Sequence, residues 1–467
     1  MDTKENKSLN ISVKSFLTAI VVIFALMIAS YILTIFIPGG EFARVPDESG
    51  NLIIDTTARF SYVDGGLPFW KWLLSPVLVL TASGSGTLIA VIAFLLVIGG
   101  VFNSLERCGL MHYMLQKTTH RFGGVRYRLM AVVTLMFMAM GAMIGSFEEC
   151  VPLVPIVVAL SVSLGWDAMT GVGMSLLAAG CGFASGVCNP FTVGVAQQLA
   201  GLPMFSGAWM RVLSFILIYL LLLLFLRSHA KRNERPLENL KAVSEFAPNA
   251  KMDRGLGYFV VIMGIGIAAI LCSGFITALQ DYTMIIVAVM FLAAGIFSTL
   301  ISGMSGKDLG KTFLGGVMSI LPAVIMILMA SSIRYTLEEA KVLDTILYAA
   351  VSMAQTLPKW AVVEFIYLLV LVMNFFIPSG SAKAFMLIPL IVPMAQVFGI
   401  SAQLCVLAFA FGDGFSNVFY PTNPALLISL GLAEVSYCDW FKWSVKFQLL
   451  NLLLTGLLLL FALAVGY

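Results

Sequence analysis

Long apolar segments alternate with short polar ones along the whole chain of 467 residues. An apolar helix needs roughly 20 residues to cross the hydrocarbon core of a bilayer, and runs close to that length recur from end to end. We therefore predict nine membrane spans, at residues 16–38, 88–102, 168–200, 208–226, 256–278, 283–302, 313–332, 402–434 and 443–465. Residues 39–70 are predicted to form a polar loop, and 104–126 and 335–357 to form helices along the membrane surface.

Two of the remaining apolar segments are too long for one span and have polar centres. Residues 127–165 contain the sequence GSFEE, and residues 360–398 contain PSGSAKA. A helix that enters the membrane, turns at the polar sequence and leaves on the side of entry fits both segments. We predict two re-entrant hairpins.

Two of the predicted spans are themselves interrupted. The first, 168–200, is broken at Gly180–Pro190, and the second, 402–434, at Tyr420–Pro424. Proline and glycine clusters end helices, so both spans are predicted to have unwound centres. Unpaired backbone groups survive at membrane depth only where they line a cavity inside the protein, which makes these breaks candidate binding sites.

The second hairpin and break repeat the first at one common spacing. The matched landmarks are Pro155 with Pro389, Gly165 with Gly399, Gly180 with Gly414, and Asn189–Pro190 with Asn423–Pro424. This predicts a duplication: a first repeat over 1–226, a basic linker over 227–255, an extra span at 256–278, and a second repeat over 279–467. The extra span inverts the second copy in the membrane. The predicted fold class is an all-α polytopic membrane protein with an inverted-topology repeat, which is the architecture of secondary transporters.

The basic residues predict how the chain is oriented. Of its 27 Lys and Arg residues, 19 fall on the predicted cytoplasmic segments and seven on the outside segments. Cytoplasmic loops carry an excess of Lys and Arg. We therefore expect a cytoplasmic N-terminus, a cytoplasmic linker at 227–255 and an external C-terminus.

Composition narrows the function classes. Sixty per cent of the residues are hydrophobic and 11% are charged, against about 25% charged in soluble domains. The net charge of +3 does not suggest a nucleic-acid partner, and seven cysteines without a CxxC motif do not suggest disulfides or a metal site. The chain has no HExxH or GxSxG motif and no histidine within a predicted span, so we expect no enzyme and no cofactor. A channel, the other alternative, would not require inverted halves that each hold a hairpin and a broken span.

Four charged residues fall at membrane depth: Glu148, Glu149, Lys383 and Asp413. Each costs about 2.5–3.5 kcal/mol at a helix centre, so they must face one another, water or a charged ligand. Ionisable groups inside the membrane are functional by default, and we assign all four to substrate binding. The structural alternative is that Glu148 or Glu149 only pairs with Lys383 and stabilises the fold.

Small polar residues at the tips and breaks complete the predicted site. Substrate binding is assigned to Ser146, Ser379 and Ser381 at the hairpin tips and to Asn189 and Asn423 at the breaks. Coupling to an ion, sodium or a proton, is assigned to Ser185, Thr192 and Thr422, because oxygen ligands suit a hard cation. Helix N-termini after the tips suit a carboxylate. The alternative is that these residues only cap and pack membrane helices.

The charges at the predicted midplane favour an amino acid as the substrate. Three acids stand against one base, so a dicarboxylate would meet a net negative site unless the acids were protonated or cation-bound. An amino acid can place its carboxylate near Lys383 and its ammonium near Glu148 or Glu149, and the surplus acid suits a basic side chain or a coupling ion. A C4-dicarboxylate carrier coupled to sodium or protons is the second hypothesis.

The tips PSGSAKA and GSFEE, each followed by a proline-punctuated helix and an Asn-Pro break, resemble those of the ion transporter superfamily. The whole chain is similar to the YfcC-like branch of the anaerobic C4-dicarboxylate carrier group, whose members are described as basic amino acid antiporters. The resemblance implies a homodimer in the bacterial cytoplasmic (inner) membrane, with sodium or proton coupling or exchange. It also implies an elevator mechanism, in which 127–200 and 360–434 move relative to 14–38, 208–226 and 283–302.

Overall fold

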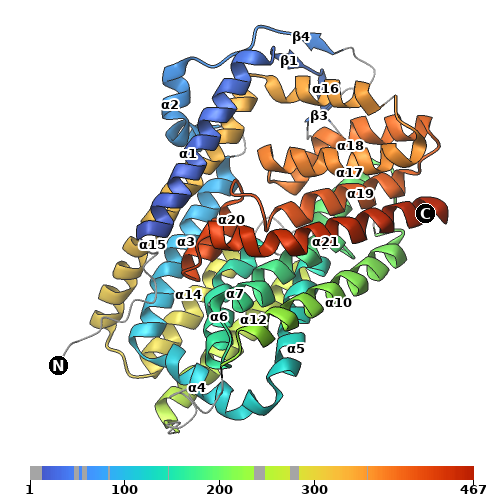
Figure 1. Cartoon of the computed structure of the whole chain (residues 1–467). Coiled ribbons are helices and arrows are strands. Elements are labelled where there is room, and N and C mark those ends of the chain that lie inside the picture. Colours follow the sequence, from blue (N-terminus) through green and yellow to red (C-terminus); the bar gives the residue numbers. More distant parts are fainter. Residues whose placement is uncertain are drawn as a thin grey trace.

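The computed structural model consists mostly of helices that pack side by side (Figure 1). It describes residues 13–46, 52–54, 60–82, 85–145, 147–203, 205–235, 248–273, 283–354 and 356–467. Within them, seven helices are long and apolar enough to cross a membrane, judged by length and composition. This supports a multi-pass membrane protein.

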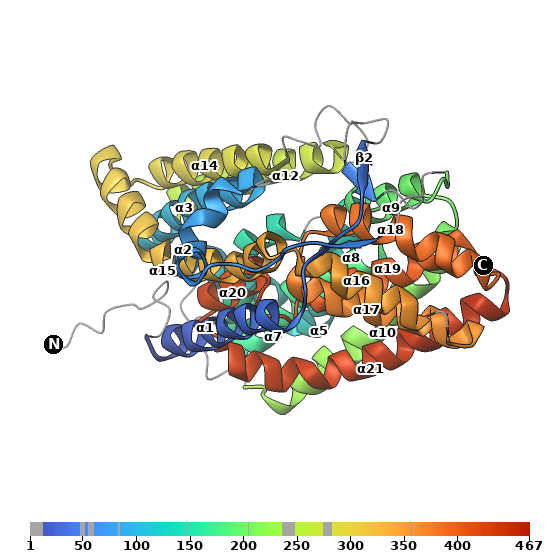
Figure 2. The same cartoon turned by 90° about the horizontal axis from the view of Figure 1, so that it is seen from above.

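One group of long helices occupies one side of the molecule in Figure 2. Its members are α1 (Val13–Phe36), α3 (Ser85–Arg107), α12 (Ala250–Ser273), α14 (Thr283–Ile301) and α15 (Gly306–Glu339). Helix α3 packs against α14 and α15, α15 packs against α1, and α12 packs against α14. We call these five helices the scaffold group.

A second group contains the predicted hairpins. The first hairpin segment consists of α5 (Arg126–Ile144), the 3-10 helix η3 (Glu148–Leu153) and α6 (Val154–Ser163). Its two ends lie together, because Nη1 of Arg126 donates a hydrogen bond of 3.2 Å to the carbonyl of Leu164. The second segment consists of α17 (Lys359–Phe376) and α18 (Gly380–Val397), and Lys359 again lies beside the far end, at Gly399. Each segment therefore returns to the side where it starts.

Each predicted broken span is divided into two parts by its break. In the first span, the part before the break consists of α7 (Ala168–Val172), a π-helical turn and α8 (Ala178–Ser185). The part after the break consists of a second π-helical turn, η5 (Pro190–Gly194), and α9 (Val195–Leu199). The second span consists of α19 (Ala402–Ser416) and α20 (Pro424–Leu432).

The first break starts later than the sequence predicted. We expected the interruption to begin at Gly180, but α8 continues through this residue to Ser185 and ends at Gly186, whose φ of +50° is left-handed. The reason is packing. A Cβ on Gly180 would lie closer than 3.0 Å to the side chain of Val418, so glycine is needed there for a close helix contact.

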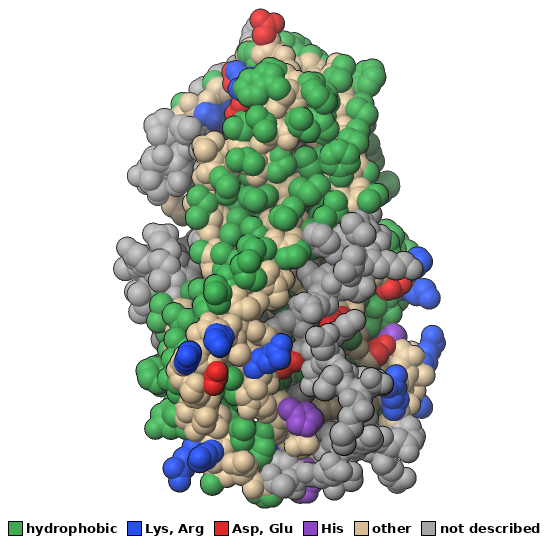
Figure 3. All heavy atoms as spheres, turned by 90° about the vertical axis from the view of Figure 1, so that its left-hand side faces the viewer, with side chains coloured by type: hydrophobic (Ala, Val, Ile, Leu, Met, Phe, Trp, Pro, Cys, Tyr) green, Lys and Arg blue, Asp and Glu red, His purple; other side chains and the backbone are tan. Residues whose placement is uncertain are grey.

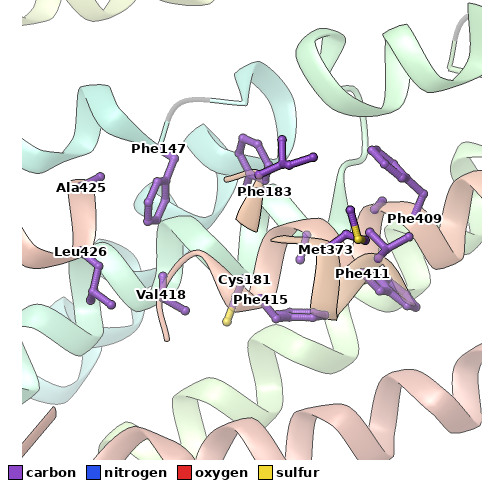
Figure 4. Close-up of a cluster of buried hydrophobic side chains, with 14 of the residues drawn as sticks. Phe147, Cys181, Phe183, Met373, Phe409, Phe411, Phe415, Val418, Ala425 and Leu426 are labelled. Carbon is purple, nitrogen blue, oxygen red and sulfur yellow. The ribbon is translucent and has the colours of Figure 1, made fainter. Parts of the chain in front are cut away.

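The two broken spans cross at a reciprocal contact. Gly180 of α8 meets Val418, and Gly414 of α19 meets Ala184 of α8. The offset between the repeats is 234, since 389 − 155 equals 234, and it relates Gly180 to Gly414 and Ala184 to Val418. Each contact is thus the repeat-equivalent of the other. Around the crossing lies a hydrophobic core that includes Phe183 and Phe415 (Figure 4).

Packing elsewhere follows the same reciprocity. The contact of α3 with α14 has its counterpart in the contact of α15 with α1. The contact of α5 with α8 has its counterpart in the contact of α17 with α19. The helices α4 (Leu110–Phe122) and α16 (Val342–Ala354) are offset by about one repeat, and they lie at opposite ends of the molecule in Figure 1.

Four expectations need correction. The surface helix predicted at 335–357 starts later, because α15 continues to Glu339 and α16 begins at Val342. The span predicted at 208–226 is α10 (Ala208–Arg232), which takes in the start of the linker. It packs against α5, α8 and α21 (Tyr437–Ala464), and so belongs with the hairpins rather than with the scaffold group. The fourth correction concerns the first polar loop.

That loop contains structure that the sequence did not reveal. It holds two short strand pairs, β1 (Gly40–Glu41) with β4 (Ser61–Tyr62) and β2 (Arg44–Pro46) with β3 (Leu52–Ile54), and is followed by helix α2 (Phe69–Leu78). Trp72 of α2 is buried and donates its indole N–H to the carbonyl of Met27 at 3.1 Å. The helix therefore packs on α1.

The loop is fastened to α16 by a buried carboxylate. Nη2 of Arg44 lies 2.8 and 2.9 Å from the two carboxylate oxygens of Asp344, and the backbone N–H of Phe42 donates to the same group at 3.0 Å. Asp344 is 4% exposed. A second, exposed pair joins Lys341 to Glu41 at 2.8 Å.

These two ion pairs predict different effects on stability. Asp344→Asn should destabilise the protein by about 1.5–3 kcal/mol, the usual worth of hydrogen bonds to a charged group. Lys341→Met should cost at most about 1 kcal/mol, as for other exposed pairs. Thermal unfolding of the two purified variants in detergent measures both. Equal losses would show that the buried carboxylate does not fasten the loop.

The face of the molecule shown in Figure 3 is hydrophobic over its upper part, and Lys and Arg side chains gather in its lower part. The exposed apolar side chains of α1 are Val21, Phe24, Ile28, Ile32, Ile35 and Phe36. A surface of this kind suits contact with lipid.

Candidate functional site

A fully buried ion pair lies where the second hairpin meets the second broken span. Nζ of Lys383, in the first turn of α18, is 2.6 Å from Oδ1 of Asp413 on α19, and both side chains are 0% exposed. Lys383 also donates to the side-chain oxygen of Asn374 and, at 3.0 Å, to the carbonyl of Ile377. Two hydrogen-bond acceptors and the carboxylate of Asp413 thus lie around the ammonium.

Asn374 is the central residue of this network, and sequence reasoning missed it. Its amide nitrogen donates to Oγ of Ser416 at 2.7 Å and to Oδ1 of Asn417 at 2.9 Å, and approaches the carbonyl of Asp413 at 3.2 Å. Asn374 therefore ties the last turn of α17 to the C-terminal end of α19. A single amide in an apolar helix gives little signal, although Asp413, Ser416 and Asn417 stand at the helical spacing that would have indicated a shared polar face.

The network continues to one of the predicted breaks. Nδ2 of Asn423 donates to Asn417 at 3.0 Å, and its Oδ1 accepts the N–H of Ala425 at 2.9 Å, which caps α20. Asn189, the matched residue of the first repeat, accepts the N–H of Thr192 at 3.3 Å. Each asparagine side chain therefore accepts a hydrogen bond from a backbone N–H near the start of the half-helix that follows its own break.

The tip of the second hairpin contacts the first repeat. A Cβ on Gly380, the first residue of α18, would lie closer than 3.0 Å to Thr192 of η5 and 2.7 Å from Oδ2 of Asp413. Hairpin, break and buried ion pair thus meet at one point. Thr192 is 1% exposed, and its hydroxyl has no hydrogen-bond partner among the described residues.

The tip of the first hairpin makes the reciprocal contact. Gly145, at a φ of +77°, lies against the side chain of Asn189, and η3 packs against α20 of the second repeat. Phe147 is buried there, with its ring 6.3 Å from that of Phe183 (Figure 4). Each hairpin tip therefore touches the half-helix that follows the break of the other repeat.

The remaining predicted residues take different positions. Ser185 donates to the carbonyl of Cys181 at 2.8 Å within α8, and Thr422 is buried without a hydrogen-bond partner in the described part of the chain. Ser379 is exposed and Ser381 half-buried at the start of α18. Ser146 and the side chains of Glu148 and Glu149 lie outside what the structure describes, although the backbone of both glutamates begins η3.

Arg211, in the first turn of α10, is a fully buried cation. Its guanidinium donates to the carbonyls of Ser206 at 2.9 Å, Phe205 at 3.0 Å and Val187 at 3.3 Å. Val187 lies in the first break, so Arg211 satisfies one of the carbonyls freed there. This contact holds α10 against the broken span.

A carboxylate fixes the start of the first broken span. Asp167 caps α7 through the N–H of Thr170 at 2.9 Å, and its second oxygen lies 2.8 Å from Nε2 of His229 on α10. Burial raises the pKa of Asp167, but the hydrogen bonds with His229 and Thr170 outweigh burial and lower this pKa to about 2, from an ordinary value of 3.8.

This shift predicts a dependence of stability on pH. Because the pKa is lower in the folded protein, the charged carboxylate stabilises the fold above about pH 4, and this contribution is lost as the pH falls toward about 2. Asp167→Asn keeps a good helix cap and removes the charge. The difference in melting temperature between wild type and this variant should be constant near neutral pH and shrink through that window. A difference that persists at pH 2 would contradict the assignment.

Comparison with known proteins identifies the family and relatives of this chain. The family described as C4-dicarboxylate anaerobic carrier matches residues 16–464. A protein of Escherichia coli (strain K12) named "Putative basic amino acid antiporter YfcC" is 29% identical, over 82% of this chain and 80% of that protein. An uncharacterized protein of Haemophilus influenzae (strain ATCC 51907 / DSM 11121 / KW20 / Rd) is 25% identical, over 79% of this chain and 74% of that protein.

Two solved transporter structures also align over most of the chain. The Alcanivorax borkumensis YdaH transporter is 18% identical with a TM-score of 0.45, covering 97% of this chain and 99% of that one. Neisseria gonorrhoeae MtrF is 17% identical with a TM-score of 0.42, covering 95% and 94%. At these TM-scores neither likeness decides anything about this chain.

The helices and the family match define a multi-pass membrane transporter. The chain belongs to the C4-dicarboxylate anaerobic carrier family, whose model spans nearly all of it.

Proposed function

We propose that this protein is a secondary active transporter of a small carboxylate-bearing solute, with basic amino acids preferred, and that it works by an elevator mechanism in the bacterial inner membrane. The observation that carries the proposal is the reciprocal contact of each hairpin tip with the half-helix after the other repeat's break. Secondary transporters bind substrate where inverted repeats meet at broken helices.

The inverted repeat is supported by the crossing of the broken spans. Two contacts related by the same offset, Gly180 with Val418 and Gly414 with Ala184, are what a two-fold relation between the repeats requires. The helix α16, placed opposite α4, fits the same relation. With the cytoplasmic excess of basic residues, this supports a cytoplasmic N-terminus and an external C-terminus.

The charges of the site support a cationic substrate. Lys383 and Asp413 neutralise each other, and we assign Glu148 and Glu149 of the first tip to the substrate. The substrate carboxylate then binds at the N-terminus of α18, where Ser379 makes no side-chain capping bond and the helix end attracts an anion. Glu148 and Glu149 take the ammonium and the basic side chain, and Ser185, Thr192 and Thr422 serve the coupling ion.

Counterflow in proteoliposomes tests this assignment. Wild-type protein should exchange labelled arginine or ornithine faster than a neutral amino acid or succinate. Glu148→Gln and Glu149→Gln should each lower arginine exchange about tenfold or more, the usual loss on removing a buried charge partner. Glu338→Gln is the matched control, because Glu338 is exposed and its ion pair within the described residues is with Arg334 on its own helix. Exchange of succinate alone, unchanged in the two tip variants, would overturn the proposal.

A C4-dicarboxylate is the second candidate, and the description of the matched family favours it. Its binding requires the two glutamates to be protonated or cation-bound. Succinate exchange that rises as the pH falls, or as sodium is added, would identify this case.

A further inference from the structure

A carboxylate outside the proposed substrate site lies between the outer arm of the second hairpin and the last helix. Oε1 of Glu364, on α17, is buried and has no hydrogen-bond partner among the described residues. Its Oε2 lies 3.2 Å from where a Cβ of Gly456 on α21 would stand. The glycine therefore leaves the room that this carboxylate occupies.

Further polar groups line the same helix contact. The hydroxyl of Tyr367, one turn after Glu364, lies 2.9 Å from Oγ1 of Thr455, which in turn donates to the carbonyl of Asn451 at 2.8 Å. The side-chain oxygen and nitrogen of Asn451 are both buried without a partner in the described part of the chain, at 1% exposure of the residue. Burying such groups unpaired costs free energy, so the cluster needs a reason other than stability.

Packing does not supply that reason. The first repeat makes the equivalent contact between α5 and α10, where Tyr219 donates to the carbonyl of Ala131 at 3.0 Å but the five equivalent positions are apolar. At the offset of 234, the counterparts of Glu364, Tyr367, Asn451, Thr455 and Gly456 are Met130, Val133, Leu217, Leu221 and Leu222. The fold thus makes this contact without a carboxylate in one repeat and with Glu364 in the other.

No ion pair among the described residues includes Glu364. On the helices that pack against α17, Lys383 and Asp413 pair with each other, and Asp344 pairs with Arg44. Arg334 of α15 pairs with Glu338, and Glu339 with Lys71.

The cations without an ion pair lie further away along the helices. Lys359 is five residues before Glu364, about 7.5 Å along the axis and on another face of α17. Lys446 is the nearest lysine to Gly456 on α21, at about 15 Å along the axis, and Lys307 and Lys311 lie in the first turns of the long helix α15. A half-buried carboxyl group with one oxygen buried and unpartnered, and with no ion pair in the described part of the chain, is satisfied most simply by a proton of its own.

We propose that Glu364 is a proton-binding site that couples proton movement to transport, with Tyr367, Thr455 and Asn451 as its polar surroundings. The coupling of this proton to transport rests on the proposed function, whereas proton binding by Glu364 does not. A proton suits the site better than sodium, because the hydroxyls of Tyr367 and Thr455 already bond each other. The described residues also contain no group of three acidic, histidine or cysteine side chains for a metal ion.

The test compares two kinds of transport in proteoliposomes. Glu364→Gln mimics the protonated acid, so arginine counterflow without a gradient should stay within about twofold of wild type. Uptake driven by a pH gradient should lose about tenfold or more of its acceleration, since the variant cannot release the proton. Glu364→Met introduces methionine, the residue that the first repeat has at the equivalent position 130, and should behave in the same way. The control Glu338→Gln should leave both transport modes unchanged. Gradient-driven uptake that survives in both Glu364 variants would overturn the proposal, as would acceleration by a sodium gradient that both variants lose.

A measurement without substrate separates this proposal from the proposed function. Infrared difference spectra over a pH titration should show a component of the protonated-carboxyl absorption in the wild-type protein that both Glu364 variants lack, whereas the other carboxyl groups of the chain contribute equally to all three spectra. If the absorption behaves in this way but arginine is not transported, only the proposed substrate is wrong. If arginine is transported but the absorption is the same in wild type and variants, the proton site is wrong.

Discussion

Replacing Lys383 with methionine is expected to destabilise the protein by about 3–5 kcal/mol and to stop transport, because the change leaves the carboxylate of Asp413 buried without its counter-charge. Both side chains are 0% exposed. Asn374 would lose its charged partner at the same time and could no longer hold α17, α18 and α19 together in the same way. Thermal and denaturant unfolding of the purified variant in detergent measure the loss.

The double variant Lys383→Met with Asp413→Leu should recover most of that stability, because replacing a buried ion pair with apolar groups is often neutral or stabilising. It should remain inactive if the pair contributes to transport and not only to the fold. A matched control is Lys341→Met, which removes an exposed cation paired at 2.8 Å. If Lys383→Met were as stable as this control, the buried pair would not be the centre of the site.

Adding one methyl group where the broken spans cross is expected to have the second large effect. Gly414→Ala should cost about 1–3 kcal/mol or more, because the new Cβ would meet the backbone of Ala184, which cannot move aside. Gly180→Ala should cost less, since its new Cβ meets only the side chain of Val418. Unfolding midpoints of the two variants give the order.

A double-mutant cycle makes this prediction sharper. Val418→Ala should offset part of the cost of Gly180→Ala, whereas Ala184→Gly should offset little of the cost of Gly414→Ala, because the Cα and N of residue 184 remain. Gly264→Ala on α12 is the control, since nothing lies within 4 Å of its Cβ position. It should stabilise the helix by about 0.5–1 kcal/mol. Equal rescue in both cycles would mean that the helices do not cross at these glycines.

The long-range order of the chain could be predicted because proline fixes the backbone, glycine allows conformations that other residues avoid, and asparagine favours helix caps. The matched pairs Pro155 with Pro389 and Asn189 with Asn423 therefore aligned the two repeats from sequence alone. The same reasoning failed at Gly180, because glycine also serves close helix packing. A sequence does not distinguish these two uses of glycine.

The site was predicted only in part. Lys383 and Asp413 stood out because a charge in an apolar run is costly, but their pairing depends on two helices that are not adjacent in sequence. Asn374 carries no charge and did not stand out, although its side chain hydrogen-bonds to Lys383, Asp413, Ser416 and Asn417. Helix α2 escaped notice because its ten residues are too short for a span and include Pro76.

The proposed elevator mechanism requires the hairpins and broken spans to move as one unit against the scaffold group. Glu106 of α3 and Glu434, just after α20, are close enough to repel each other, and they lie on opposite sides of the boundary between the two groups. Both would be replaced by cysteine in a background without the seven native cysteines and joined with a short bifunctional reagent. The linked protein should still gain thermal stability from bound arginine and should not transport it, and reduction of a cleavable link should restore transport. Full transport by a protein shown to be linked would contradict the elevator mechanism.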